Sequence, residues 1–378
     1  MIPRSGIRKF FDLIASMEGV ISLGVGEPDY VTPWCIREAA IYALEKGHTM
    51  YTSNYGLLEL REALAELLNR RYNVSYDPES ELLVTVGVSE ALDLAMRAIV
   101  DPGDEIIIPD PGYVSYAPCV ILAGGKVVPV PTYVEDDFKV RATAIQARVT
   151  PRTKAILLGY PNNPTGAVMT RDELLQIAQV ARRSDLLVIS DEIYDRLVYD
   201  GEHTCFASLP GMKERTILLG GFSKSYAMTG WRLGYGVMPK DLAVHITRLM
   251  TNSNSCTNAA TQVAGIAALK GPQDDVDRMV AAFRERRDVI VKGLNEIPGV
   301  SCVLPPGAFY AFPNIKGTGM KSKALADYLL DEAGVACLSG TSFGAYGEGY
   351  LRLSYANSVP NIKKALERMA EVIAKLRK

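Results

Sequence analysis

Between about residues 82 and 238 the chain repeats one pattern, in which a short apolar run is followed by a loop and then by a longer amphipathic stretch. The short runs are rich in β-branched residues, and several are apolar throughout instead of alternating, which is typical of strands covered on both faces. They predict strands at Leu82–Val86, Glu105–Ile108, Lys126–Val130, Ala155–Leu158, Leu186–Ser190, Thr216–Leu219 and Leu233–Val237.

Helical patterns separate some of these strands. The apolar residues of Ser89–Val100 fall on one face of a helix, and Arg171–Arg183 follows Thr170, with Glu173 at the spacing of a capping box. Strands that alternate with helices favour a mainly parallel sheet. We therefore expect an α/β fold whose large domain holds a mainly parallel seven-stranded sheet.

After Gly271-Pro272 the pattern changes. A long charged helical pattern spans Asp274–Glu296 and is expected to connect two domains. Residues 1 to about 43 have no strand series of their own, so we expect them to pack on the second domain. The sequence thus predicts a large domain at residues 44–276 and a smaller α+β domain built from residues 1–43 and 277–378. The further elements expected in the smaller domain are strands at Val300–Leu304, Ala308–Phe312 and Tyr350–Ser354 and helices near Ser322–Glu332 and Val359–Lys375.

Composition narrows the class of protein without changing the fold. Of the 378 residues 48% are hydrophobic and 22% are charged, which is ordinary for a globular protein. A net charge of −2 gives no electrostatic attraction to nucleic acid or to an anionic membrane. The N-terminal apolar run is interrupted by Asp12 and Glu18, so it makes a poor signal peptide, and no stretch approaches the roughly 20 apolar residues of a membrane span.

The cysteines point to a reducing compartment. All six lie far apart in the sequence and do not cluster with the three histidines. This spacing argues against a zinc site and against a disulfide scaffold. We expect a cytoplasmic protein without a bound metal.

One lysine stands among residues that suit a bound small molecule. Lys224 lies within Gly220-Gly221-Phe222-Ser223-Lys224-Ser225, and Thr229-Gly230-Trp231-Arg232-Leu233-Gly234 follows. A lysine amine can condense with an aldehyde, and the glycines let the backbone approach a ligand closely. A lone loop lysine is more often a solvated side chain, and the stretch is not a P-loop because no glycine immediately precedes the lysine. Three further motifs favour a site: Asn162-Asn163-Pro164-Thr165-Gly166, Asp191-Glu192-Ile193-Tyr194 and, late in the chain, Arg352.

Together these motifs resemble the class I, fold-type I aminotransferases, most of all prokaryotic enzymes of the aspartate and aromatic type and relatives that act on N-acetylated diaminopimelate. The resemblance runs from Ser22–Asp29 to Gly349–Tyr355. It implies pyridoxal phosphate as the cofactor and transfer of an amino group from an L-amino acid to a 2-oxo acid such as 2-oxoglutarate by a ping-pong mechanism. It also implies a homodimer with shared active sites.

The resemblance assigns roles that the chemistry of each residue supports. Lys224 holds the cofactor aldehyde and then moves the proton at the substrate α-carbon. Asp191 keeps the pyridine nitrogen protonated, although a carboxylate at a strand end often only caps a helix. Tyr194 and Asn163 bond the phenolic oxygen of the cofactor. Tyr113 stacks on the pyridine ring, where the plainer reading is an ordinary core tyrosine.

The cofactor phosphate needs several donors. Backbone N–H groups at Val88 and the hydroxyl of Ser89, at the start of a predicted helix, make an anion site, although a serine there could serve only as an N-cap. The resemblance adds the charge of Arg232, the hydroxyl of Ser223 and, from the neighbouring subunit, Tyr51.

The substrate α-carboxylate is expected at Arg352. A guanidinium supplies the bidentate geometry that a lysine does not. The resemblance adds Asn163 and a backbone contact from Gly26. Because these contacts come from different domains, ligand binding should draw the domains together.

The chain departs from the family pattern at three places. Gly221 stands where many members have a serine, so one phosphate contact is expected to be missing, and Val88 stands where glycine is frequent. The stretch Thr251–Thr261 holds no arginine for a second substrate carboxylate. Aspartate, aromatic and other donors therefore all remain open.

Two other functions were weighed on the same fold. A carbon–sulfur β-lyase also removes the α-proton of an amino acid. A ligand-sensing module of a transcription regulator needs an added DNA-binding domain, whereas here the family motif begins near the N-terminus and the chain is slightly acidic. An inactive relative would lack Lys224 or Asp191, and both are present.

Overall fold

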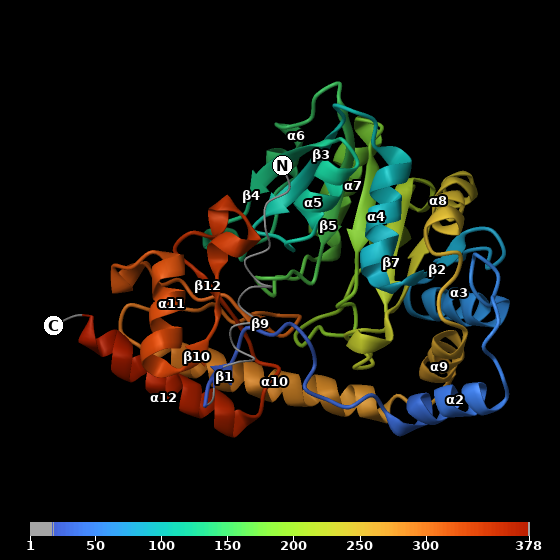
Figure 1. Ribbon diagram of the computed structural model, residues 1–378. Helices are drawn as coiled ribbons and strands as arrows, with labels where there is room; N and C mark the ends of the chain where they lie inside the picture. Colours follow the sequence, from blue (N-terminus) through green and yellow to red (C-terminus); the bar gives the residue numbers. More distant parts are fainter. Residues whose placement is uncertain (1–16, 18, 377–378) are drawn as a thin grey trace.

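The computed structural model describes residues 17 and 19–376. It consists of a large α/β region and a smaller α+β region that lie side by side (Figure 1). The long helix α10 (Asp274–Asn295) runs beneath both regions and connects them, as its charged pattern predicted.

The large region is built on a seven-stranded sheet, which confirms the expected fold class. The strand order is β2-β8-β7-β6-β5-β3-β4, and β8 alone runs antiparallel to its neighbours. All seven predicted strands are present, with ends that differ by a few residues at most. Their bounds are β2 (Leu82–Val86), β3 (Glu105–Asp110), β4 (Lys126–Pro131), β5 (Thr153–Gly159), β6 (Leu187–Asp191), β7 (Thr216–Gly221) and β8 (Leu233–Val237).

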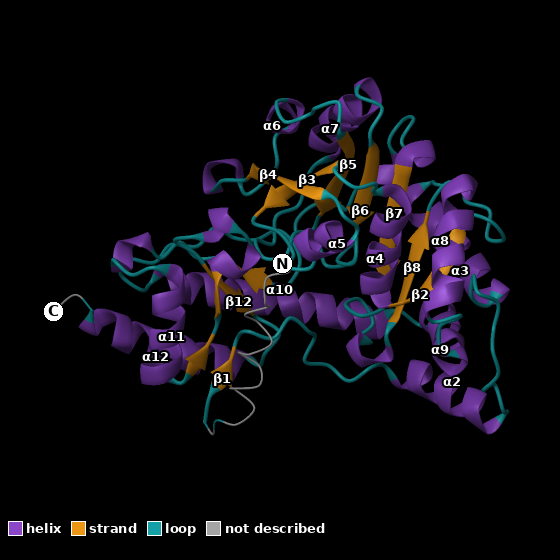
Figure 2. Cartoon of the chain, turned by 45° about the horizontal axis from the view of Figure 1, so that its top comes forward, coloured by secondary structure: helices purple, strands orange, loops and turns teal. Residues whose placement is uncertain are grey.

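Helices cover the sheet on both faces (Figure 2). The apolar faces of α4 (Gly87–Ile99), α5 (Tyr116–Leu122) and α8 (Lys240–Ser253) form one core with the strands. On the other face α7 (Arg171–Arg183) and α6 (Ala142–Gln146) form a second core. A third core holds α3 (Leu58–Tyr72) and α9 (Ala259–Lys270).

The predicted capping box starts α7. The Thr170 hydroxyl accepts the Glu173 N–H at 3.3 Å, and the Glu173 carboxylate accepts the Thr170 N–H at 2.7 Å. These bonds satisfy donors that a helix start leaves free.

The smaller region packs short strands against helices. A three-stranded antiparallel sheet has the order β11-β12-β9, and β1 pairs with β10 in parallel. Their apolar side chains meet those of α10 in one core. The bounds are β1 (Ile21–Ser22), β9 (Tyr310–Ala311), β10 (Val335–Ala336), β11 (Leu338–Ser339), β12 (Leu351–Ser354), α11 (Ser322–Ala333) and α12 (Val359–Lys375).

The prediction of a strand at Val300–Leu304 is wrong. Only Ser301 forms an isolated bridge, with Asn314. The side-chain amide of Asn295 accepts the N–H of Cys302 at 2.8 Å and donates to its carbonyl at 2.9 Å. A side chain thus takes the backbone bonds that a neighbouring strand would need.

The N-terminal segment divides between the two regions. Residues 21–22 pair with β10 in the smaller region, as expected. Helix α2 (Trp34–Glu45), however, packs on α9, and its buried Ile36 and Ala40 join the core of α3 and α9. The expectation that residues 1–43 pack on the smaller domain therefore fails for 34–43, because the apolar face of α2 matches the large-region helices; residues 1–16 and 18 lie outside the described part.

An aromatic cluster joins the two regions. Phe138 of the large region meets Phe312 and Tyr350 edge-on at ring distances of 5.5 and 5.4 Å. Phe312 and Tyr350 stack on each other at 5.0 Å. This contact holds the β9–β12 sheet against the large region.

Within residues 17 and 19–376, no helix has the length and apolar character to cross a bilayer. In the same part of the chain no group of His, Cys, Asp and Glu side chains is arranged to hold a metal.

Candidate active site

Lys224 lies just after β7, where the strand ends at Gly221. Its amine donates to the carbonyl oxygen of Gly26 at 2.6 Å. Removal from water lowers the pKa of the Lys224 amine to about 8, although the charge of Glu27 opposes this shift. A lysine with such a pKa is neutral, and therefore nucleophilic, far more often at neutral pH than a surface lysine.

Asp191 ends β6 and is 6% exposed. Burial raises the pKa of its carboxyl to about 6. The Tyr116 hydroxyl, which donates to the carboxylate at 2.9 Å, opposes this shift. The sequence analysis missed Tyr116. It packs edge-on against Tyr113 at 5.4 Å, and a Cβ at Gly159 would lie 2.2 Å from its hydroxyl, so this contact requires a glycine. Its place three residues after Tyr113 was the one sequence feature that could have indicated Tyr116 as a site residue.

Arg352 brings the smaller region to this site. It lies in β12, 3% exposed, and its guanidinium donates to the Asn163 side-chain oxygen at 3.1 Å and to the Gly24 carbonyl. Its Nε is buried without a hydrogen-bond partner among the described atoms. A buried cation with a spare donor is costly unless an anion pairs with it. The geometry therefore suits a carboxylate ligand.

Tyr194 contacts a residue that the sequence analysis did not select. Its hydroxyl lies 2.8 Å from the hydroxyl of Tyr310, and both side chains are buried. The Tyr310 hydroxyl also lies 3.5 Å from the Gly26 carbonyl. Gly26 thus accepts a bond from Lys224, while its carbonyl lies farther from the Tyr310 hydroxyl than Tyr194 does, and a Cβ at Gly26 would lie 2.8 Å from that hydroxyl.

The start of α4 forms the other end of the site. Val88 and Ser89 lie in its first turn, and a Cβ at Gly87 would lie 2.5 Å from a terminal nitrogen of Arg232. The guanidinium therefore rests on the helix N-terminus, beside a cavity of about 770 Å³. Free backbone N–H groups and a guanidinium suit a phosphate.

The two other hydroxyl groups expected at the phosphate, those of Ser223 and Tyr51, lie in contrasting environments. Ser223 is buried beside Lys224 in the same turn. Tyr51 is 89% exposed and is not brought into the site by its own chain.

The two departures from the family pattern near this phosphate end explain each other. A Cβ at Gly221 would lie 2.9 Å from a methyl carbon of Val88 and 3.2 Å from the Leu233 carbonyl oxygen. Val88 therefore occupies the space that a side chain at position 221 would need. A valine at 88 and a glycine at 221 are compatible, whereas a valine and a serine are not without a shift.

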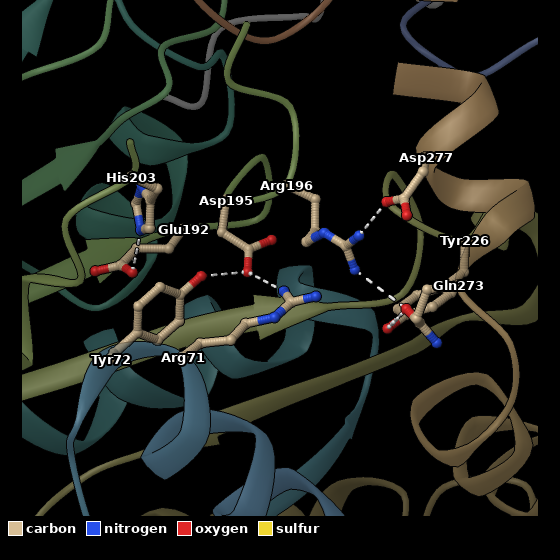
Figure 3. A network of polar contacts seen from close by, with 9 residues as sticks. All are labelled: Arg71, Tyr72, Glu192, Asp195, Arg196, His203, Tyr226, Gln273 and Asp277. Atoms are coloured by element: carbon tan, nitrogen blue, oxygen red, sulfur yellow. Dashed lines mark hydrogen bonds and ion pairs between the residues drawn. The ribbon is translucent and has the colours of Figure 1, made fainter. Parts of the chain in front are cut away.

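A buried polar network anchors the segment that carries Asp191 and Tyr194 (Figure 3). Glu192, between them, accepts the Ser190 hydroxyl at 2.9 Å and contacts the His203 ring at 2.6 Å. Burial alone would lower the pKa of His203, but the charge of Glu192 outweighs it and raises that pKa. The raised pKa favours the protonated form of the His203 ring.

The next residues extend the network to distant helices. Asp195 accepts the Tyr72 hydroxyl of α3 at 2.7 Å, and Arg196 donates to Asp277 of α10 at 2.8 Å and to Gln273 at 3.1 Å (Figure 3). None of these residues was expected from the sequence, because polar contacts between distant segments leave no local pattern. The network fixes the backbone behind the site.

The residues brought together fit the cofactor that the resemblance implies. Lys224 offers an amine for its aldehyde, and Asp191 a buried carboxylate for its ring nitrogen. Tyr194 and Asn163 offer a hydroxyl and an amide for its phenolic oxygen. The α4 start with Arg232 suits its phosphate, and the unpartnered Nε of Arg352 suits a substrate carboxylate.

Comparisons with known proteins agree with this geometry. The model of the family described as aminotransferase class I and II matches residues 18–369. An aromatic-amino-acid aminotransferase of Thermococcus litoralis is 44% identical over 99% of this chain and 96% of its own length. An aspartate aminotransferase of Pyrococcus abyssi is 44% identical over the same shares. The crystal structure of an aromatic aminotransferase from Pyrococcus horikoshii has a TM-score of 0.93 and 43% identity, and covers 98% of this chain and 100% of that one.

The pKa of Lys224 gives a first prediction. In the cofactor-free protein, labelling of Lys224 by a small aldehyde with borohydride should rise with pH through a midpoint near 8, because only the neutral amine reacts. Peptide mass spectrometry measures the label. Glu27→Gln removes a charge that raises this pKa and should move the midpoint down. A midpoint near the ordinary lysine value of about 10.4 would contradict the prediction.

The contact between positions 88 and 221 gives a second prediction. Gly221→Ser should destabilise the protein by about 1–3 kcal/mol, as overpacking does, and should weaken cofactor binding. Adding Val88→Gly should recover part of this loss, with Val88→Gly alone as the control for the helix cost of glycine. Denaturant unfolding and cofactor titration of all four proteins measure it. Additive effects, with no coupling between the sites, would rule out the compensation.

Proposed function

Because the chain belongs to the aminotransferase class I and II family, we propose that it moves the amino group of an aspartate, aromatic or related L-amino acid to a 2-oxo acid such as 2-oxoglutarate by a ping-pong mechanism. The chain is a pyridoxal-phosphate-dependent aminotransferase of fold type I. The donor, the role of each residue and the assembly are the substance of the proposal.

One observation supports the proposal most directly. The Lys224 amine and the Arg352 guanidinium bond to the carbonyl oxygens of Gly26 and Gly24, two residues apart on one segment. An α-amino acid carries its amine and its carboxylate on a single carbon. The Lys224 amine marks the place of the cofactor aldehyde, which would take up the substrate amine, and the buried Arg352 guanidinium beside it would bind the carboxylate.

Each residue then has a physical task. Pyridoxal phosphate, when bound, supplies an aldehyde that takes up the amino group and a ring that withdraws electrons from the α-carbon. Lys224 would take the proton from the α-carbon as a base and deliver it as an acid to the C4′ carbon of the cofactor, a task that its lowered pKa favours. Asp191 holds a proton on the ring nitrogen, and Tyr194 with Asn163 would bind the phenolic oxygen.

The remaining residues bind the anionic groups. Arg352 binds the α-carboxylate, with Gly26 beside it. The N–H of Val88 and the hydroxyl of Ser89, together with Arg232 and Ser223, would hold the phosphate, and Tyr113 would pack on the ring. Closing the smaller region over the ligand excludes water and strengthens these charge contacts.

The donor is the least constrained part of the proposal. Relatives of equal identity are named for aspartate and for aromatic amino acids. No arginine in Thr251–Thr261 is available for a distal carboxylate. We therefore propose a broad donor range and do not favour a dicarboxylate. Nothing in the comparisons favours the carbon–sulfur lyase or the ligand-sensing alternative.

We also propose a homodimer with shared active sites. Tyr51 and a group of apolar side chains near it are exposed on the single chain, and a second copy would cover them and bring Tyr51 to the partner's phosphate site. The group consists of Trp34, Ile41, Tyr42, Leu44 and Met50. Two expectations stay predictions. One is the division into domains at residues 44–276 and at 1–43 with 277–378, apart from the packing of α2, and the other is the cytoplasmic location.

The test of the function is a donor screen. Purified protein with pyridoxal phosphate should convert 2-oxoglutarate to glutamate with at least one of aspartate, tyrosine, alanine and N-acetyl-diaminopimelate. Lys224→Ala should lower kcat by about 10³-fold or more, since it loses both the cofactor link and the proton carrier. Lys213→Ala, at the far end of β7 and paired with Glu81, is the matched control. Pyruvate released from cysteine without amino transfer would instead establish the lyase.

The dimer predicts the effect of one hydroxyl. Tyr51→Phe should make the cofactor dissociate faster during gel filtration, because the partner's phosphate loses a donor. Tyr133→Phe, at a tyrosine that is also exposed but lies outside this apolar group, should not. Light scattering gives the mass under the same conditions. A monomer that keeps full activity would refute the shared site.

A further inference from the structure

Tyr310 lies between Arg352 and Tyr194 and contacts both side chains. It is 1% exposed, in β9. Ser354 pairs with Tyr310 across the strands, and Arg352 is two residues from Ser354 on the same face of the sheet. Diagonal neighbours of this kind are within reach of long side chains. The register of β9 on β12 therefore sets the Tyr310 ring under the Arg352 side chain.

The ring of Tyr310 supports Arg352. The guanidinium carbon lies 4.5 Å from the ring centroid, and the Phe343 ring lies on it at 4.8 Å. Two aromatic faces attract the cation and limit its rotation in a site from which water is excluded. The guanidinium edge is thereby aimed at Asn163 and at the position of a substrate carboxylate.

The hydroxyl of Tyr310 reaches Tyr194. By distance either hydroxyl could donate across the 2.8 Å contact. Burial raises the pKa of Tyr310, but the charge of Arg352 lowers it, whereas burial raises the pKa of Tyr194 well above its usual value. Tyr310 has one proton to donate, and the Tyr194 oxygen at 2.8 Å is a nearer acceptor for it than the Gly26 carbonyl at 3.5 Å. The weaker rise of its pKa also makes Tyr310 the better donor of the two tyrosines. If it donates, the proton of Tyr194 is free to point to another acceptor.

We propose that Tyr310 is a positioning residue of the amino-transfer site: its hydroxyl directs the Tyr194 hydroxyl toward the cofactor, and its ring holds the Arg352 guanidinium in place for the substrate carboxylate. The inference rests on the roles proposed for Tyr194 and Arg352. It explains why Gly26 has no side chain, since a Cβ there would lie 2.8 Å from the Tyr310 hydroxyl.

The test separates the hydroxyl from the ring. Tyr310→Phe removes only the hydroxyl, and Tyr310→Leu removes both. Tyr355→Phe is the matched control, because Tyr355 is a fully buried tyrosine of the same core whose hydroxyl donates to the Ala308 carbonyl at 3.1 Å. The holoenzymes are compared by the pH midpoint of the absorbance change of the bound cofactor and by kcat and KM for the best donor.

Tyr310→Phe should raise the absorbance midpoint by about 0.5–1 pH unit, the scale of one neutral hydrogen bond, since a less well aimed Tyr194 proton stabilises the ionised phenolic oxygen less. Its KM should stay near that of the unmodified protein. Tyr310→Leu should also raise KM by about tenfold, the scale of a desolvated cation–π contact. If Tyr310→Leu does not fold, Tyr310→Met takes its place.

The outcomes distinguish the two proposals. If Tyr310→Phe leaves the midpoint where Tyr355→Phe leaves it, the role of the hydroxyl is refuted while the function stands. If Tyr310→Leu keeps the KM of Tyr310→Phe, the role of the ring is refuted. If the unmodified holoenzyme neither binds the cofactor through Lys224 nor transfers an amino group, the function and this inference fall together.

Discussion

The site depends on two carbonyl oxygens in one N-terminal segment. The Gly24 carbonyl accepts from Arg352 of the smaller region, and the Gly26 carbonyl accepts from Lys224 of the large region. Leu23, next to them, bonds through its backbone to Ala336 and Ser354 of the smaller region. A segment without a strand series of its own thus joins the two regions at the proposed site, and the missing side chain of Gly26 leaves room for the Tyr310 hydroxyl.

Burial acts on the charged groups of this site in opposite directions. It raises the pKa of the Asp191 carboxyl to about 6 and lowers that of the Lys224 amine to about 8. Both pKa values are therefore closer to neutral pH than those of the same groups in water. A lysine whose pKa lies near the working pH can both take up and release a proton. The groups that oppose these shifts are Glu27 at Lys224 and the Tyr116 hydroxyl at Asp191, whereas the charge of Glu192 adds to the shift of Asp191.

Much of the fold and part of the site followed from local patterns. Period and apolar runs located all seven strands of the large sheet, and the capping box located α7, because burial on both faces and helix capping act over a few residues. The same reasoning failed at Val300–Leu304, where the Asn295 amide takes the backbone bonds, and at α2, whose apolar face fits either region until the partner helix is known. Lys224, Asp191 and Arg352 could be predicted as site residues because their motifs are local.

The sequence by itself determined the chemistry: the amine, the carboxylate and the guanidinium, and the family pattern that relates them. Only the tertiary structure decided their partners. Tyr116 on Asp191, Tyr310 on Tyr194 and the space shared by Val88 and Gly221 come from strands and helices that are distant in sequence. The reason is physical: a motif fixes the residue type within a short stretch, whereas a contact depends on strand register and close packing across the whole fold.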